Sequence, residues 1–204
     1  MASIFEKTSN EVRQEEITPR TKESMLWLTQ KMKTIRLNSR PEVLRSPELK
    51  QRKQLLPTRP MIGSMHMFKY RPKHKATLPY YDEYPVVILV GKAEGGFLGL
   101  NLHYLPPVLR SRFLQFMYEK TNNNKFDETT RFTAMWKRIN KGATRRYLAP
   151  MIKHYLTSNI PGYIAQVQSN EWEIASYLPF QRFRKANQNK VWLDAYAEII
   201  QGPK

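Results

Sequence analysis

Residues 64–104 read SMHMFKYRPKHKATLPYYDEYPVVILVGKAEGGFLGLNLHY and hold the strongest structural pattern of the chain. Side chains alternate over 65–70 with a period of two, which indicates a strand. The run VVILV at 86–90 is apolar throughout, as in a strand buried on both faces. Gly95-Gly96 supplies a turn and 97–104 alternates again, which predicts a hairpin with a five- or six-residue connection. Because a lone hairpin is marginal, it must join further strands or be covered by helices.

The segment before this pattern, residues 1–60, is rich in Lys and Arg and is broken by prolines in its second half. Thr18-Pro19 is a good helix start, with a hydroxyl at the cap and proline at the first helical position. A helix over about 19–37 would carry one apolar stripe, with Trp27 off that stripe. Beyond it, little apolar surface is available for burial, so we expect an extended arm, or a short helix over roughly 47–55, that only a neighbour orders. The stripe comprises Met25, Leu28, Met32 and Ile35.

After Pro106-Pro107 the period becomes helical. We expect a helix capped by Asp127, a helical piece over 150–156, and a short helix that Ser169 caps. The segment 162–168 is ambiguous and could form a late strand. The predicted fold is therefore α+β, with a small SH3-like β-barrel over 61–105, a helical region over 106–204 packed on it, and the N-terminal arm over 1–60.

The composition narrows the class of protein. The chain has 204 residues, is 41% hydrophobic and carries a net charge of +17. This charge favours nucleic acid or an acidic protein surface as the partner. The chain has no cysteine, so disulfides, thiol nucleophiles and thiolate zinc sites are excluded. The start of the sequence does not resemble a signal peptide, and no apolar run approaches the ~18 residues of a membrane span.

Two basic clusters are candidate sites for nucleic acid or another partner. Contacts between such cations and phosphates release counterions, so the affinity falls as salt rises. Trp136 and Tyr147 lie near the second cluster and could stack on unpaired bases, although their helical spacing favours a place in the core. The first cluster is Lys69, Arg71, Lys73 and Lys75, and the second is Arg131, Lys137, Arg138, Lys141, Arg145, Arg146 and Lys153.

Four aromatic residues are candidate interface anchors: Trp27, Tyr80, Tyr81 and Tyr84. Tyrosine and tryptophan supply a large contact area at a low entropic cost, and the three tyrosines lie in a loop stiffened by prolines. Packing of this loop over one end of the barrel is an alternative role, compatible with the first.

No catalytic, metal or cofactor motif is present. The four histidines are widely separated, and none has the spacing of metal ligands. His66 and His103 could face each other across neighbouring strands, near Asp82 and Glu83, as the acid–base pair of a metal-free ribonuclease. Ordinary structural histidines explain the pattern better, so the sequence predicts a non-enzymatic protein without metal or cofactor.

Three long motifs resemble a family of proteins from T-even-like contractile-tailed bacteriophages and their cyanophage relatives. They are LPYYDEYPVVILV at 78–90, GGFLGLNLHYLPPVLR at 95–110 and NEWEIASYLPFQRFRKA at 170–186. The resemblance covers roughly 61–190. Members of the family are described as virion structural proteins, and some as the DNA end protector, which implies a protein that shields the termini of the packaged genome. The resemblance implies no catalytic residue.

Two functions of different classes follow. The first is a structural virion protein that docks in the neck, tail or baseplate through its arm and basic faces, with other phage structural proteins as partners. The second is a DNA end-protecting protein that binds duplex termini. Both imply a protein of the virion that is assembled in the host cytoplasm without a membrane. A fainter similarity in shape to the barrel of MazF-type toxins leaves an endoribonuclease as a remote third possibility.

Overall fold

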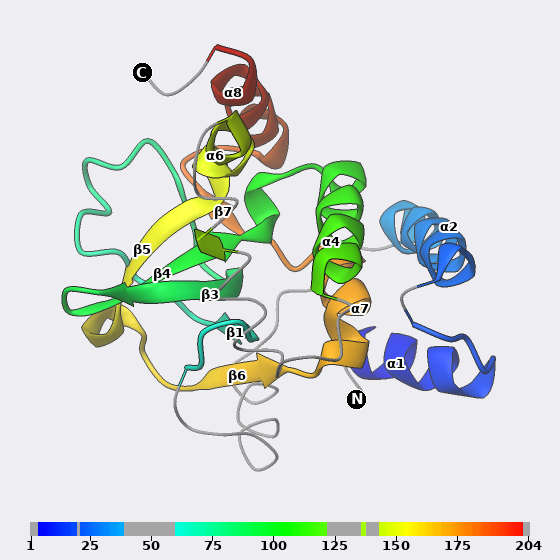
Figure 1. Cartoon of the computed structure of the whole chain (residues 1–204). Coiled ribbons are helices and arrows are strands. Elements are labelled where there is room, and N and C mark those ends of the chain that lie inside the picture. Colours follow the sequence, from blue (N-terminus) through cyan, green and yellow to red (C-terminus); the bar gives the residue numbers. More distant parts are fainter. Residues whose placement is uncertain (1–3, 20, 39–59, 122–135, 138–142, 202–204) are drawn as a thin grey trace.

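The computed structural model describes residues 4–19, 21–38, 60–121, 136–137 and 143–201 (Figure 1). Its centre is a five-stranded antiparallel sheet in the order β5-β4-β3-β1-β6. Segments from the middle and the last third of the chain therefore build one sheet. The strands are β1 (Met65–Phe68), β3 (Val86–Ala93), β4 (Gly96–Asn101), β5 (Ile152–Leu156) and β6 (Ile164–Val167).

The predicted hairpin is confirmed, but its connection is shorter than expected. Ala93 pairs with Gly96, so only Glu94 and Gly95 form the turn. Gly95 has a φ of 67°, which glycine adopts without a steric penalty. A Cβ on Gly96 would lie 1.8 Å from the carbonyl oxygen of Tyr155, so glycine also allows β5 to approach β4 closely.

The sheet is open, and the expected SH3-like barrel is not confirmed. β5 and β6 are the two edge strands of the sheet, so the ladder of hydrogen bonds does not close on itself. The α+β class holds, because a mixed set of helices and an antiparallel sheet forms the structure. The residues that complete the sheet, 152–156 and 164–167, lie outside the segment that the sequence pattern assigned to the barrel.

One face of the sheet packs against helices in the main hydrophobic core (Figure 1). Met65, Met67 and Ile88 point to this side and are buried with Leu114 of α4 and Ile174 of α7. Burying apolar side chains of this size provides most of the stabilisation of a fold. The helices are α4 (Pro107–Thr121), α6 (Ala143–Leu148), α7 (Trp172–Tyr177) and α8 (Gln188–Gln201). Short 3₁₀ turns link the elements: Leu102–Tyr104, Ala149–Met151, Thr157–Asn159 and Ser169–Glu171.

The opposite face of the sheet carries a smaller, aromatic cluster. Phe68 lies edge-on to the rings of Tyr70, Phe97 and Tyr155, at centroid distances between 5.2 and 6.3 Å. These geometries are the ones that aromatic pairs favour. Val87 and Leu89 complete the cluster. Polar side chains lie at the edge of this aromatic cluster, and the candidate site begins at that edge.

Two helices occupy the N-terminal region where one helix and an extended arm were expected. They are α1 (Ile4–Gln14) and α2 (Lys22–Asn38). Both contact α7 and lie on its side away from the sheet (Figure 1). Phe5 is 0% and Leu28 is 2% exposed, so both helices contribute to the main core. The helix expected over about 19–37 is therefore present as α2, and α1 is an additional helix; the arm that a neighbour was expected to order beyond α2 remains a prediction, because residues 39–59 lie outside the described residues.

The start of α2 differs from the one that Thr18-Pro19 suggested. Thr21 Oγ1 accepts a hydrogen bond from the Ser24 amide, and Ser24 Oγ accepts one from the Thr21 amide. This reciprocal pair is a capping box, which satisfies amide groups that a helix start leaves without partners. This capping box begins three residues after Thr18, and α2 therefore begins at Lys22 and not at Pro19.

The structure of the C-terminal region agrees in part with the elements predicted from the sequence. The ambiguous segment 162–168 contains a strand, β6, and a short helix, α7, is present as expected, but Ser169 does not cap it: Ser169 begins a 3₁₀ turn, and the residue before α7 is Glu171. The segment 150–156 is not helical, because Ile152–Leu156 pairs with β4 as an edge strand. The helix expected after Asp127 lies outside the described residues. The division of the chain into three domains remains a prediction.

Among the residues described, no helix is long and apolar enough to cross a bilayer.

Candidate nucleic-acid interface

A short ribbon brings two distant basic segments together. β2 (Tyr81–Asp82) pairs antiparallel with β7 (Phe183–Arg184), and the Glu83 amide donates to the Arg182 carbonyl at 3.0 Å. Lys185 Nζ donates to the carbonyls of Ala76 and Leu78 at 2.6 and 2.9 Å. The loop that follows β1 is therefore fixed to the end of β7, although about a hundred residues separate them in sequence.

We call the resulting surface the basic face. Glu83 lies among these cations and forms ion pairs with three of them: Arg184 at 2.6 Å, Arg182 at 3.6 Å and Lys69 at 3.9 Å. A single carboxylate shared by three cations leaves a local excess of positive charge, which raises the concentration of anions nearby. The basic face comprises Lys69, Arg71, Lys73, Lys75, Arg182, Arg184 and Lys185.

Three cations of the basic face are available to an outside anion. Arg71, Lys73 and Lys75 are exposed, and within the described ranges no ion pair or hydrogen bond holds their charged ends. The backbone beneath them is fixed, because the Arg71 amide donates to the Asn159 carbonyl and Asn159 Nδ2 donates to the Arg71 carbonyl. A fixed backbone under free cations is an arrangement that can follow the phosphates of a nucleic acid.

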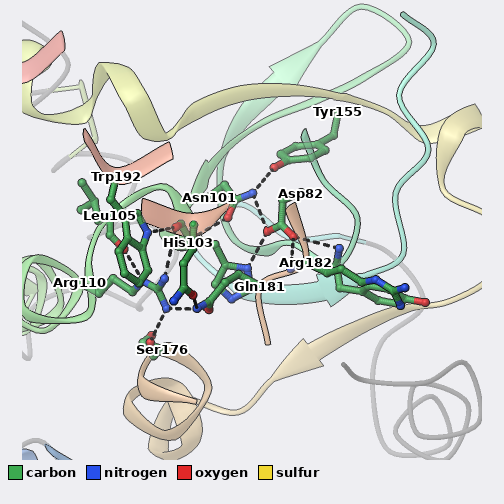
Figure 2. A network of polar contacts seen from close by, with 12 residues as sticks. Asp82, Asn101, His103, Leu105, Arg110, Tyr155, Ser176, Gln181, Arg182 and Trp192 are labelled. Atoms are coloured by element: carbon green, nitrogen blue, oxygen red, sulfur yellow. Dashed lines mark hydrogen bonds and ion pairs between the residues drawn. The ribbon is translucent and has the colours of Figure 1, made fainter. Parts of the chain in front are cut away.

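The buried carboxylate of Asp82 holds the two strands of the ribbon in place (Figure 2). Asp82 is 3% exposed, and its Oδ1 accepts from the amides of Tyr84 and Arg182 at 3.1 and 3.2 Å. Its Oδ2 lies 2.6 Å from His103 Nδ1 and 3.3 Å from Asn101 Nδ2. One side chain therefore joins both strands of the ribbon to the end of β4.

The charge state of this pair follows from its surroundings. Burial alone would raise the pKa of Asp82, but His103 and the two backbone amides hold it below its ordinary value. Burial lowers the pKa of His103, and the opposing influence of Asp82 does not reverse this. An ionised carboxylate accepts only, so the neutral imidazole carries its proton on Nδ1 and donates it to Asp82. His103 Nε2 then has no hydrogen-bond partner in the described part of the chain.

Arg110 continues the network into the helices (Figure 2). It is 1% exposed, and its guanidinium donates to the carbonyls of His103, Leu105 and Ser176. Trp192 of α8 donates to the same His103 carbonyl at 3.0 Å. A buried guanidinium needs several acceptors to offset its lost hydration. These bonds join the turn after β4 to α4, α7 and α8 beside the site.

The histidine pair of a ribonuclease is not formed. His66 of β1 aligns with Val87, which in turn aligns with Asn101, so β3 lies between the two histidines. His66 is 1% and His103 is 0% exposed, and neither can reach an RNA backbone. His66 Nδ1 lies 3.1 Å from the Ser64 carbonyl, and burial lowers the pKa of this imidazole to about 4. Both histidines are structural.

Only part of the second basic cluster lies within the described residues. Arg145 and Arg146 of α6 are exposed, as is Lys137, whereas Arg131, Arg138 and Lys141 lie outside the described residues. Lys153 is half-buried with its Nζ 4.2 Å from the centroid of the Tyr104 ring, and burial lowers its pKa. The predicted partner-binding roles of these residues remain predictions.

The candidate anchors all make contacts within the chain. Trp27 Nε1 donates to Glu15 at 2.6 Å, and Lys31 lies over the Trp27 ring. Tyr80 packs against the rings of Tyr104 and Phe183. Tyr81 and Tyr84 are half-buried, and Lys69 lies 5.7 Å from the Tyr84 ring. Their role as anchors for a partner remains a prediction.

The sequence shows the charges of the site but not how they come together. Arg182, Arg184 and Lys185, three of the seven residues of the basic face, stand out as the RFRK run at 182–185 that follows the second cluster, and no local signal places this run beside 69–75. The role of Glu83 and the amide bonds to Asp82 had no local signal, because they depend on a pairing between residues about a hundred positions apart. In the described ranges, no group of His, Cys, Asp or Glu could hold a metal ion.

The fold and this surface define a basic α+β protein whose positively charged face is held by a buried polar network. The family model of the phage T4 terminal DNA protecting protein matches residues 6–195. The chain therefore belongs to this family of phage proteins, in agreement with the resemblance found in the sequence. No curated protein and no solved structure matches the chain.

Proposed function

We propose that this protein binds the termini of duplex DNA through the basic face and shields them from exonucleases. The family match favours this function over docking in the neck, tail or baseplate, to which it gives no support. The observation that carries the proposal is the convergence of 69–75 and 182–185 on one fixed surface. The protein would travel with the genome in the virion after assembly in the host cytoplasm.

The geometry supports contacts to the backbone of DNA. Arg71, Lys73 and Lys75 provide free cations on a loop whose two ends are fixed by Asn159 and Lys185. Arg182 and Arg184 provide guanidinium groups that share Glu83 and can each turn one edge to a phosphate. Contacts of this kind position a protein on DNA without reading its sequence.

The test compares a blunt-ended linear duplex with a covalently closed circle of the same sequence. We expect tighter binding to the linear duplex, an affinity that falls steeply with salt, and slower digestion by a processive exonuclease. The variant R71Q/K73Q/K75Q should lower the affinity about a hundredfold at 0.1 M salt, with a salt slope smaller by about 2 to 3.

The matched control is K22Q/K92Q, which removes two exposed lysines that lie outside both basic clusters. It should keep the affinity for DNA within about twofold, since surface changes outside the contact have small effects. Equal binding to the circle and the linear duplex would refute end recognition. An unchanged salt slope in the triple variant would remove the basic face from the site.

A further inference from the structure

An apolar groove at one end of the molecule is separate from the basic face. It lies between α4, α6 and α8, and α6 and α8 lie side by side at this end (Figure 1). Its volume is about 260 Å³, below the roughly 300–1,000 Å³ of small-molecule sites, so it suits a few side chains of a docked segment. Its apolar lining includes Leu109, Phe113, Phe116, Leu148 and Ile199.

The helices that form the groove also carry large exposed apolar side chains. Tyr147 of α6 lines it and is 59% exposed, and Val108 of α4 is 64% exposed. On α8, Tyr196 and Ile200 are exposed beside Ile199. Soluble chains rarely expose so many large apolar groups together, and where they do the surface usually binds a partner.

The positive charges at the rim of the groove favour an acidic partner. Arg112 lines the groove, and Arg145 and Arg146 lie on the helix that forms one of its walls. In the described ranges, no acidic side chain lines the groove, and no ion pair engages Arg112 or Arg145. An apolar floor with a rim of guanidinium groups complements a segment that has apolar side chains on one side and carboxylates on the other.

We propose that this groove docks an acidic amphipathic segment of another protein. A DNA backbone would leave the apolar floor without a partner, whereas apolar side chains of a peptide would fill it. A second copy of the chain would add to the mutual repulsion of two molecules that each carry +17. The groove thus gives the protein a docking surface that does not depend on the proposed binding of DNA.

The test uses a fluorescent helical peptide with leucine at i, i+3, i+4 and i+7 positions and glutamate elsewhere. We expect the full chain to bind it with micromolar affinity, and to bind a scrambled peptide of equal charge at least about tenfold more weakly. R112E/R145E should weaken binding of the amphipathic peptide about tenfold or more. Y147A, a change at an exposed side chain, should weaken it about threefold to tenfold.

The matched control is K73E/K75E, which reverses charge on the basic face and should leave the binding of the peptide unchanged. Thermal unfolding of each variant verifies its fold, and the exposed positions 112, 145 and 147 are expected to tolerate substitution. Three results would overturn the proposal: equal binding of the scrambled peptide, displacement of the peptide by a short DNA duplex, or loss of binding in K73E/K75E.

Discussion

The two faces of the central sheet are built by different means. One buries methionine, valine, isoleucine and leucine against helices, and its free energy comes from apolar surface removed from water. The other ends in a polar network in which Asp82, Asn101 and His103 exchange directed hydrogen bonds beneath a charged ribbon. Apolar packing tolerates small shifts, whereas a buried network loses much of its energy when one bond is lost. The basic face is therefore held by the hydrogen-bond network, which tolerates less change than the apolar core.

The largest effect is expected at the centre of the network. Asp82→Ala removes the acceptor of two backbone amides and of the imidazole of His103, and leaves these donors buried without partners. The free energy of unfolding should fall by about 3–5 kcal/mol, as measured by denaturant titration. Glu94→Ala removes an exposed carboxylate from the β3–β4 turn and should cost less than about 0.5 kcal/mol. A cost below about 1 kcal/mol for Asp82→Ala would mean that the ribbon does not depend on the network.

A smaller effect is expected from the pH. Burial lowers the pKa of His66 to about 4, so the unfolded chain takes up a proton at a higher pH than the folded one. Stability from this group is complete above the ordinary pKa of about 6.5 and is lost as the pH falls toward about 4. From pH 7 to pH 5 the loss should be about 2 kcal/mol. In His66→Asn, which keeps a donor for the Ser64 carbonyl, unfolding free energies should vary less over this range; an unaltered dependence would assign it to other groups.

The smallest effect concerns the anion within the basic face. Glu83→Gln removes the carboxylate that Lys69, Arg182 and Arg184 share. The backbone pairing of β2 with β7 and the bonds to Asp82 still hold the ribbon, so the cations stay in place. The affinity for duplex DNA should rise about threefold, with a salt slope steeper by about 1. Weaker binding would show that Glu83 positions the cations more than it competes with phosphate.

The sequence predicted what is local and missed what joins distant segments. The β3–β4 hairpin was recognised because alternation and two glycines lie within a few residues of each other. The local pattern at 150–156 predicts a helix. Ile152–Leu156 forms a strand instead because it pairs with β4, which lies some fifty residues earlier in the sequence and gives no local signal. The N-terminal helices looked unsupported, since Phe5 and Leu28 find their burial against α7, far along the chain.

The candidate site shows the same division. Lys69, Arg71, Lys73 and Lys75 were found because their charge is evident in one short run. The other half of the basic face required the pairing of Tyr81 with Arg184, which no local pattern encodes. The buried pair of Asp82 and His103 was expected only as two residues in the same neighbourhood, because hydrogen-bond geometry depends on the completed fold.

The pairing of β2 with β7 also sets an order of events during synthesis. Residues 69–75 leave the ribosome long before 182–185. In the same way, β1 cannot pair with β6 until residues 164–167 have been synthesised. Contacts between segments so distant in sequence form late, because the intervening chain must first be made and closed. A nascent chain that has not reached Phe183 therefore carries scattered cations and no assembled face. The proposed binding of DNA ends would therefore become possible only near the end of translation, and truncated products would not compete for those ends.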